Sequence, residues 1–130
     1  MTIPKDFKRW HTQKEMIHEK HPRVYFHERE IWFCAVGANI GFEQDGSGVS
    51  FLRPVVIVRK FNNEVCWIVP LTKTSKIGKY YFKFSFDDSG ESSAILSQIR
   101  LIDAKRLKYK AGNMKPEDFT MLKESMRGLL

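Results

Sequence analysis

Two residues of this chain, Arg53 and Thr72, have side chains suited to holding a phosphate group. A guanidinium offers planar, paired N–H donors to phosphate oxygens, and a threonine hydroxyl adds a neutral donor. Arg53 opens one apolar run and Thr72 closes the next, so an antiparallel hairpin would bring both to one end of a sheet. Such a pair can stabilise the extra charge on a phosphate under attack. Taken alone, these residues are more simply interpreted as a strand cap, Arg53, and the start of a turn, Thr72.

Glu43 and Gln44 are candidates for reading an exposed RNA base, and Gln98 is notable for another reason. Glu43 and Gln44 lie in a loop rich in glycine and serine, residues 37–52, where a carboxylate and an amide can bond to base edges. A plain solvated loop is the alternative. Gln98 is expected inside an apolar strand, where a buried amide needs hydrogen-bonding partners.

A basic segment follows Thr72 and carries Lys73, Ser75 and Lys76, with Lys79 just before the aromatic residues 80–82. Cations interleaved with aromatic rings suit a single-stranded backbone and its unstacked bases. Basic turns also occur merely for solubility. We therefore predict RNA contacts here chiefly because Thr72 is adjacent.

The spacing of apolar residues predicts the strands that must position these side chains. Residues 31–36 form an almost unbroken apolar run, typical of a strand buried on both faces. Residues 54–59 and 64–71 read as a hairpin closed by Asn62 and Asn63. Further strands are expected at 80–86 and 94–102, with a turn at 87–92 and a helical turn at 103–107. Five or six strands so close together indicate a small curved antiparallel sheet or partly closed barrel.

Helices are predicted at both ends of the chain. The first, residues 6–19, has a narrow apolar face. The second begins at Pro116, with acidic residues in its first turn, and repeats Phe119, Leu122, Met126 and Leu129 on one face. The four histidines, at positions 11, 18, 21 and 27, precede the strands and are read as a solvated helix end and linker, not as a metal site.

Composition limits the class of protein. The chain has 130 residues, enough for one domain, and a formal net charge of +7 with a pI near 9.5, which favours an anionic partner. Cys34 and Cys66 both fall in apolar runs and are read as small buried side chains. No run resembles a membrane span or a signal peptide, so we expect a cytoplasmic protein.

Four short motifs in a fixed order carry a family resemblance. They are Gly-Phe-Glu-Gln at 41–44, Arg-Pro-Val-Val-Ile-Val at 53–58, Val-Pro-Leu-Thr at 69–72 and Leu-Ser-Gln-Ile-Arg-Leu-Ile-Asp at 96–103. Each is weak alone, but their order and spacing over residues 30–107 resemble the MazF/PemK family of toxin endoribonucleases.

The resemblance implies a mainly β (α+β) fold, an SH3-like small barrel of the MazF/PemK/CcdB type with an extra N-terminal helix and a C-terminal helix. It implies the toxin of a type II toxin–antitoxin system, which cuts single-stranded RNA without a metal or other cofactor and leaves 2′,3′-cyclic phosphate and 5′-hydroxyl ends. Arg53 and Thr72 would be the catalytic pair, and Gln98 would face the substrate groove. The partners implied are RNA, an acidic antitoxin segment and a second copy of the chain.

The chain also departs from the family pattern. Residues 45–52 lengthen the loop before Arg53, and residues 1–28 form an extra helical extension before a barrel core at 29–112 and a helix at 114–130. Two alternatives stay open: a toxin of the same fold that inhibits a protein such as DNA gyrase, and an RNA-binding barrel without activity. A histidine-based ribonuclease or a metal-dependent hydrolase is disfavoured because neither ligand nor histidine–carboxylate spacing is present.

Overall fold

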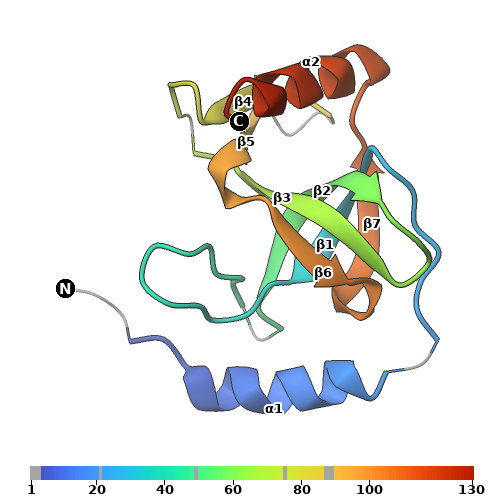
Figure 1. Cartoon of the computed structure of the whole chain (residues 1–130). Helices are drawn as coiled ribbons and strands as arrows, with labels where there is room; N and C mark the ends of the chain where they lie inside the picture. Colours follow the sequence, from blue (N-terminus) through green and yellow to red (C-terminus); the bar gives the residue numbers. More distant parts are fainter. Residues whose placement is uncertain (1–3, 21, 49, 75, 87–89) are drawn as a thin grey trace.

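The computed structural model describes residues 4–20, 22–48, 50–74, 76–86 and 90–130. Within these ranges, seven antiparallel strands form one curled sheet in the order β4-β5-β3-β2-β1-β7, and β6 pairs with β3. Helix α1 lies beneath this sheet and α2 lies above it (Figure 1). The strands are β1 Glu30–Ala35, β2 Leu52–Lys60, β3 Val65–Thr72, β4 Tyr81–Phe84, β5 Ser92–Ile95, β6 Arg100–Asp103 and β7 Leu107–Asn113. The helices are α1 Phe7–His18 and α2 Pro116–Arg127, and the 3-10 turns are η1 Leu96–Gln98 and η2 Ala104–Arg106.

The predicted hairpin is confirmed as β2 and β3. Its turn is closed by Asn62, whose Oδ1 accepts from the N–H groups of Glu64 and Val65 at 2.8 and 2.9 Å. Val55 stands opposite Pro70 in the register of the two strands. Arg53 precedes Val55 by two residues and Thr72 follows Pro70 by two, so both lie at the end of the hairpin away from its turn.

The central strands are apolar on both faces because each face has its own core. Val55 and Ile57 of β2 pack in one cluster with Phe26 and Leu107, whereas the alternate residues of β2 pack in a second cluster beneath α2. That second cluster buries Phe119 and Leu122, with Met126 and Leu129 packed against it, as the periodicity of the tail predicted. β1 is likewise buried on both faces, which accounts for its unbroken apolar run.

The long strand predicted at 94–102 is wrong. The segment is divided into β5, η1 and β6, and both strands run antiparallel to β3. Leu71 pairs with Ala94, whereas Ile68 pairs with Arg100, so the register against β3 shifts by three residues between β5 and β6. The three residues of η1 lie in this shift and are outside the sheet. Pro70 lies in this interrupted stretch and has no N–H to donate to a ladder. Gln98 is therefore part of a half-buried turn instead of a buried strand.

Strand β7 was missed because its pattern is polar. Lys108, Tyr109 and Lys110 are exposed on it, and it pairs with β1 through two register shifts. The two cysteines are confirmed as buried free thiols. Burial raises the pKa of both Cys34 and Cys66 to about 12, so they stay protonated and unreactive near neutral pH.

Helix α1 is fastened beneath the barrel at both ends. Asp6 caps it by accepting from the N–H of Arg9 at 3.0 Å, and Trp10 and Ile17 are buried against Ala35 and its neighbours. After the helix, Arg23 forms a paired bond with the carboxylate of Asp103 at 2.8 and 2.9 Å. Neither helix in the described ranges is long and apolar enough to cross a membrane.

Glu30 at the start of β1 gives a pH-dependent prediction. Burial opposes its ionisation, but hydrogen bonds from Trp32 Nε1 at 3.0 Å and His27 N at 2.8 Å, with Lys110 at 3.1 Å, prevail and hold its pKa below the usual value. Glu30→Gln is expected to lower the free energy of unfolding by about 1–2 kcal/mol at neutral pH. Because the folded pKa is depressed, this difference is full above pH ~4.3 and shrinks as the pH falls through the folded value. Urea unfolding of both proteins at neutral and acidic pH checks it; a difference that grows on acidification would contradict it.

Candidate functional site

Arg53 is anchored between two main-chain oxygens at the start of β2. Its Nε donates to the carbonyl of Asp45 at 2.6 Å, and its Nη1 donates to the carbonyl of Leu71 at 3.1 Å. Burial lowers the pKa of the guanidinium, and the negative charge of Asp45 acts in the opposite direction. An arginine keeps its charge under such conditions and has further N–H donors. Arg53 is therefore a half-buried cation of fixed orientation, suited to an anion.

Thr72 lies at the same end of the sheet, as expected. It is the last residue of β3, directly after the Leu71 carbonyl that holds Arg53. The hydroxyl Oγ1 of Thr72 accepts from the N–H of Thr74 at 3.2 Å, which starts the following turn. That bond uses an oxygen lone pair and leaves the O–H able to donate. Thr72 can therefore start the turn and still donate a hydrogen bond to a phosphate oxygen.

Asp45, which the sequence reasoning did not single out, organises the loop that supports Arg53. Its Oδ1 accepts from the N–H of Asn39 at 2.6 Å, and the Asn39 amide donates to the carbonyls of Val36 at 2.9 Å and Gln44 at 2.8 Å. The sequence feature that could have indicated this role is the presence of an asparagine and an aspartate in one glycine-rich loop, because such side chains often bond to the nearby main chain. The loop is thus a structured turn whose main chain reaches Arg53.

The segment before the barrel contacts this loop through an ion pair, hydrogen bonds and aromatic packing. Lys5 Nζ forms an ion pair with Asp45 Oδ2 at 3.0 Å and also donates to the carbonyls of Asn39 and Gly41. The ring of Trp10 lies 5.4 Å from that of Phe51, at the far end of the loop. Residues before the barrel therefore hold both ends of the segment that precedes Arg53.

Lys5→Met is expected to loosen the loop. The ion pair is partly exposed, so its loss should cost about 0–1 kcal/mol locally, which corresponds to up to about fivefold faster amide exchange. Hydrogen exchange over residues 39–46 measures this effect, and the exchange of β2 serves as the internal reference. Unchanged exchange in the loop, or equal acceleration in β2, would contradict a local grip.

Gln98 is fastened to the same loop. Its Oε1 accepts from the N–H of Gln44 at 3.4 Å, and its Nε2 donates to the carbonyl of Phe42 at 3.2 Å. Gln98 also lines a cavity of about 310 Å³ together with Glu43, Gln44 and Arg100. The carboxylate of Glu43 accepts from the N–H of Ile40 at 2.9 Å. Three predicted recognition residues thus meet at one cavity, although Gln98 is not the buried strand residue expected.

Arg100 is a second cation at this cavity that the sequence reasoning did not select. It opens β6 opposite Ile68 and is half-buried. The sequence feature that could have indicated Arg100 is its position within the motif at 96–103. Lys73 and Lys76 are exposed on the segment after β3, and Lys79 lies 5.2 Å from the ring of Tyr80. Ser75 lies outside the described residues.

No group of three or more histidine, cysteine, aspartate or glutamate side chains gathers as a metal site within the described part of the chain. Arg53 and Thr72 lie at the open end of the hairpin, and Gln98 and Arg100 line the nearby cavity together with Glu43. The fold and site define a small antiparallel β-protein that presents an oriented arginine at the open end of a hairpin.

Comparison with known proteins agrees with this class. Residues 27–130 match the family model described as PemK-like, MazF-like toxin of type II toxin-antitoxin system. The chain therefore belongs to the family of PemK-like and MazF-like toxins. No individually curated protein matches it.

Solved structures confirm the fold. The chain resembles the toxin MazF-mt6 of Mycobacterium tuberculosis, at 14% identity and a TM-score of 0.60 over 77% of this chain and 94% of that one. MazF from Deinococcus radiodurans gives 12% identity and a TM-score of 0.62 over 82% and 97% of the two chains. A mycobacterial endoribonuclease solved with its cognate antitoxin is 14% identical to this chain. The two superpose with a TM-score of 0.61 over 80% of this chain and 93% of that one. The expected fold class is thereby confirmed as the MazF fold, mainly β with two helices.

Proposed function

We propose that this chain is the toxin of a type II toxin–antitoxin system and a metal-independent endoribonuclease for single-stranded RNA. The observation that carries the proposal is the fixed guanidinium of Arg53 beside Thr72 at the open end of the hairpin. Membership of the toxin family supports it. The products expected are a 2′,3′-cyclic phosphate and a 5′-hydroxyl end.

In this mechanism the RNA supplies its own nucleophile. The 2′-hydroxyl oxygen bonds to the adjacent phosphorus, its proton leaves, and the 5′-oxygen departs and takes up a proton. Arg53 and the Thr72 hydroxyl donate hydrogen bonds to the non-bridging oxygens, whose charge increases in the transition state. A protonated guanidinium suits this electrostatic role and is a poor base.

The recognition residues proposed are those around the cavity and the following basic segment. Glu43, Gln44 and Gln98 offer hydrogen-bonding groups at the cavity that also holds Arg100. Lys73, Ser75 and Lys76 would contact the RNA backbone beyond Thr72. Base edges select the cleavage sequence, whereas cations contribute binding that does not depend on sequence.

The partners proposed are an antitoxin and a second copy of this chain. One similar structure is of an endoribonuclease with its cognate antitoxin, and the basic surface of this chain suits an acidic segment. Around a cleft of about 970 Å³ beside α2, Trp67, Leu101 and Leu130 are exposed, and such apolar patches often mark interfaces. We assign this face to the homodimer. A toxin that acts on RNA is placed in the cytoplasm, where its substrate is.

The test is incubation of the purified protein with a long single-stranded RNA in excess EDTA, followed by mapping of the product ends. Cutting at defined positions, with cyclic-phosphate and 5′-hydroxyl ends, is the expected result. Binding without cutting would indicate the passive RNA-binding barrel. Trapping of DNA gyrase on DNA in place of RNA cleavage would indicate the inhibitor alternative.

A further inference from the structure

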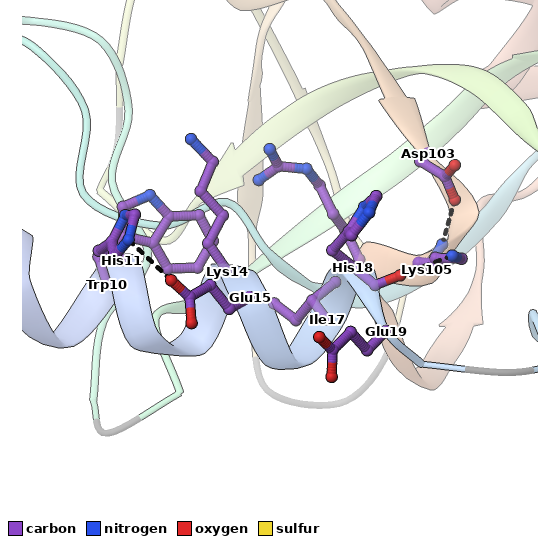
Figure 2. A pocket seen from close by; sticks show the side chains of 10 residues that line it. Trp10, His11, Lys14, Glu15, Ile17, His18, Glu19, Asp103 and Lys105 are labelled. Atoms are coloured by element: carbon purple, nitrogen blue, oxygen red, sulfur yellow. Dashed lines mark hydrogen bonds and ion pairs between the residues drawn. The ribbon is translucent and has the colours of Figure 1, made fainter.

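A further cleft lies between α1 and the underside of the barrel (Figure 2), and Arg53 is not among the residues that line it. It encloses about 550 Å³ and is lined by the upper face of α1 and by the η2 turn. Helix α1 lies outside residues 27–130, which match the toxin family. Nothing in the proposed cleavage mechanism uses this cleft.

Side chains of both charges line this cleft: Lys14, Lys105 and Arg106 lie there together with Glu15, Glu19 and Asp103. Figure 2 shows Lys14 and His18 turned up from α1 toward the barrel, whereas the carboxylates of Glu15 and Glu19 lie on the lower side of the helix. Glu15 pairs with His11 Nε2 at 2.9 Å. The Asp103 carboxylate pairs with Arg23 Nη2 at 2.8 Å. Lys14 is thus left as an exposed cation at the cleft.

Arg106 supplies a second, fixed cation. Its Nη1 donates to the carbonyl of Ala35 at 3.1 Å, and its guanidinium lies 5.6 Å from the ring of Trp10. Burial lowers the pKa of Arg106, and the positive charge of Arg100 adds to this. The negative charge of Asp103 acts in the opposite direction, and an anion bound beside Arg106 would do the same.

A third cleft joins the α1 cleft to the cavity that Gln98 and Arg100 line. It encloses about 430 Å³ and shares Trp10, His11 and Lys14 with the α1 cleft. It shares Asn39 and Glu43 with the cavity that holds Gln98. Two apolar side chains line the connection and are exposed, Phe7 at 51% and Ile40 at 80%. A continuous surface therefore runs from Gln98 across the loop to α1.

We propose that this surface, called the α1 track, binds single-stranded RNA that flanks the cut phosphodiester. Backbone phosphates would lie against Lys14 and Arg106, and an unstacked base would stack on Phe7. RNA is favoured over an acidic peptide because the track combines cations with an exposed aromatic ring and continues into the recognition cavity. This inference rests on the proposed endoribonuclease function and assigns a substrate-binding role to the N-terminal extension.

The decisive variant is Lys14→Glu, compared with Lys14→Arg and with Lys8→Glu. Lys8 is exposed on the same helix and is not among the residues that line the cleft, so it makes the same charge change elsewhere. Binding of fluorescent oligouridine is measured over a salt series. Loss of one phosphate contact should weaken binding about fivefold in roughly 0.1 M salt and reduce the slope of log K against log salt by about 0.7. Lys14→Arg should retain the wild-type affinity.

Cleavage gives a second measurement that depends on RNA length. Once the cut position is mapped, Lys14→Glu should raise KM for a long RNA without changing kcat. It should leave cleavage of an RNA trimmed to the cut position unaffected, because the trimmed substrate does not reach α1. Phe7→Ala should behave in the same way, with loss of stacking instead of charge.

Equal binding by the Lys14→Glu and Lys8→Glu variants, or equal effects on long and trimmed RNA, would overturn the proposal. Loss of affinity for a poly-glutamate peptide with RNA binding intact would overturn it in favour of an acidic protein partner. If the wild type cuts no RNA, the proposed function fails, and the oligouridine salt series still decides whether the α1 track binds RNA.

Discussion

Arg53→Ala is expected to lower kcat for RNA cleavage by about 10²–10³-fold or more, because an oriented donor to the transition-state phosphate is removed. Binding of RNA should be largely kept, since the recognition cavity and the exposed lysines remain. Arg53→Lys should recover only part of the activity. A lysine keeps the charge but cannot bond to the Asp45 and Leu71 carbonyls with the same fixed geometry.

The measurement is single-turnover cleavage of a long RNA in excess EDTA, with RNA affinity determined in parallel. Lys108→Ala removes one exposed cation from β7 and controls for net charge. Thermal unfolding of each variant confirms that the barrel is intact. Full activity of a folded Arg53→Ala protein would remove Arg53 from the mechanism. A loss of binding equal to the loss of cleavage would assign Arg53 to RNA affinity alone.

Gly37→Ala is expected to cause the largest loss of stability. Gly37 has φ of +82°, and an added Cβ would lie 2.0 Å from Cε2 of the Trp10 ring. The left-handed backbone costs about 1–2 kcal/mol for a residue with a Cβ. The overlap with a packed ring adds about 1–3 kcal/mol. The free energy of unfolding should therefore fall by roughly 2–5 kcal/mol.

Gly48→Ala is the matched control for the backbone term. Gly48 has φ of +75° in the same loop, but an added Cβ there meets nothing within 4 Å. Only the strain of about 1–2 kcal/mol is expected. Urea unfolding of the two variants separates strain from overlap. Equal destabilisation would show that Trp10 is not packed rigidly against Gly37, and would weaken the view that α1 supports the loop.

A smaller effect on cleavage should accompany the Gly37 change. Displacement of Trp10 would release the loop whose Asp45 carbonyl orients Arg53, so kcat should fall in the protein that remains folded. Because Gly37 itself lies away from the reacting atoms, this is a positioning effect. The Lys5→Met variant removes the ion pair with Asp45 in the same loop. It should also lower kcat, with little loss of global stability.

The sequence by itself determined the features that depend on local pattern. The apolar runs and the Asn62–Asn63 turn defined the β2–β3 hairpin, and that register alone placed Arg53 with Thr72. The spacing of Phe119, Leu122, Met126 and Leu129 defined α2. The order and spacing of the four motifs indicated the toxin family. Each of these features depends on residues close together in the chain, where the spacing of apolar side chains and the turn residues indicate the local structure.

Only the tertiary structure decided the features that depend on distant partners. The three-residue slip at η1 arises because β5 and β6 pair with different parts of β3, and β7 is a strand because β1 has a free edge for its polar residues. The Lys5–Asp45 ion pair and the contact of Trp10 with Gly37 join the N-terminal extension to the loop that precedes Arg53. No local period encodes such contacts, since they depend on which surfaces meet once the sheet has curled.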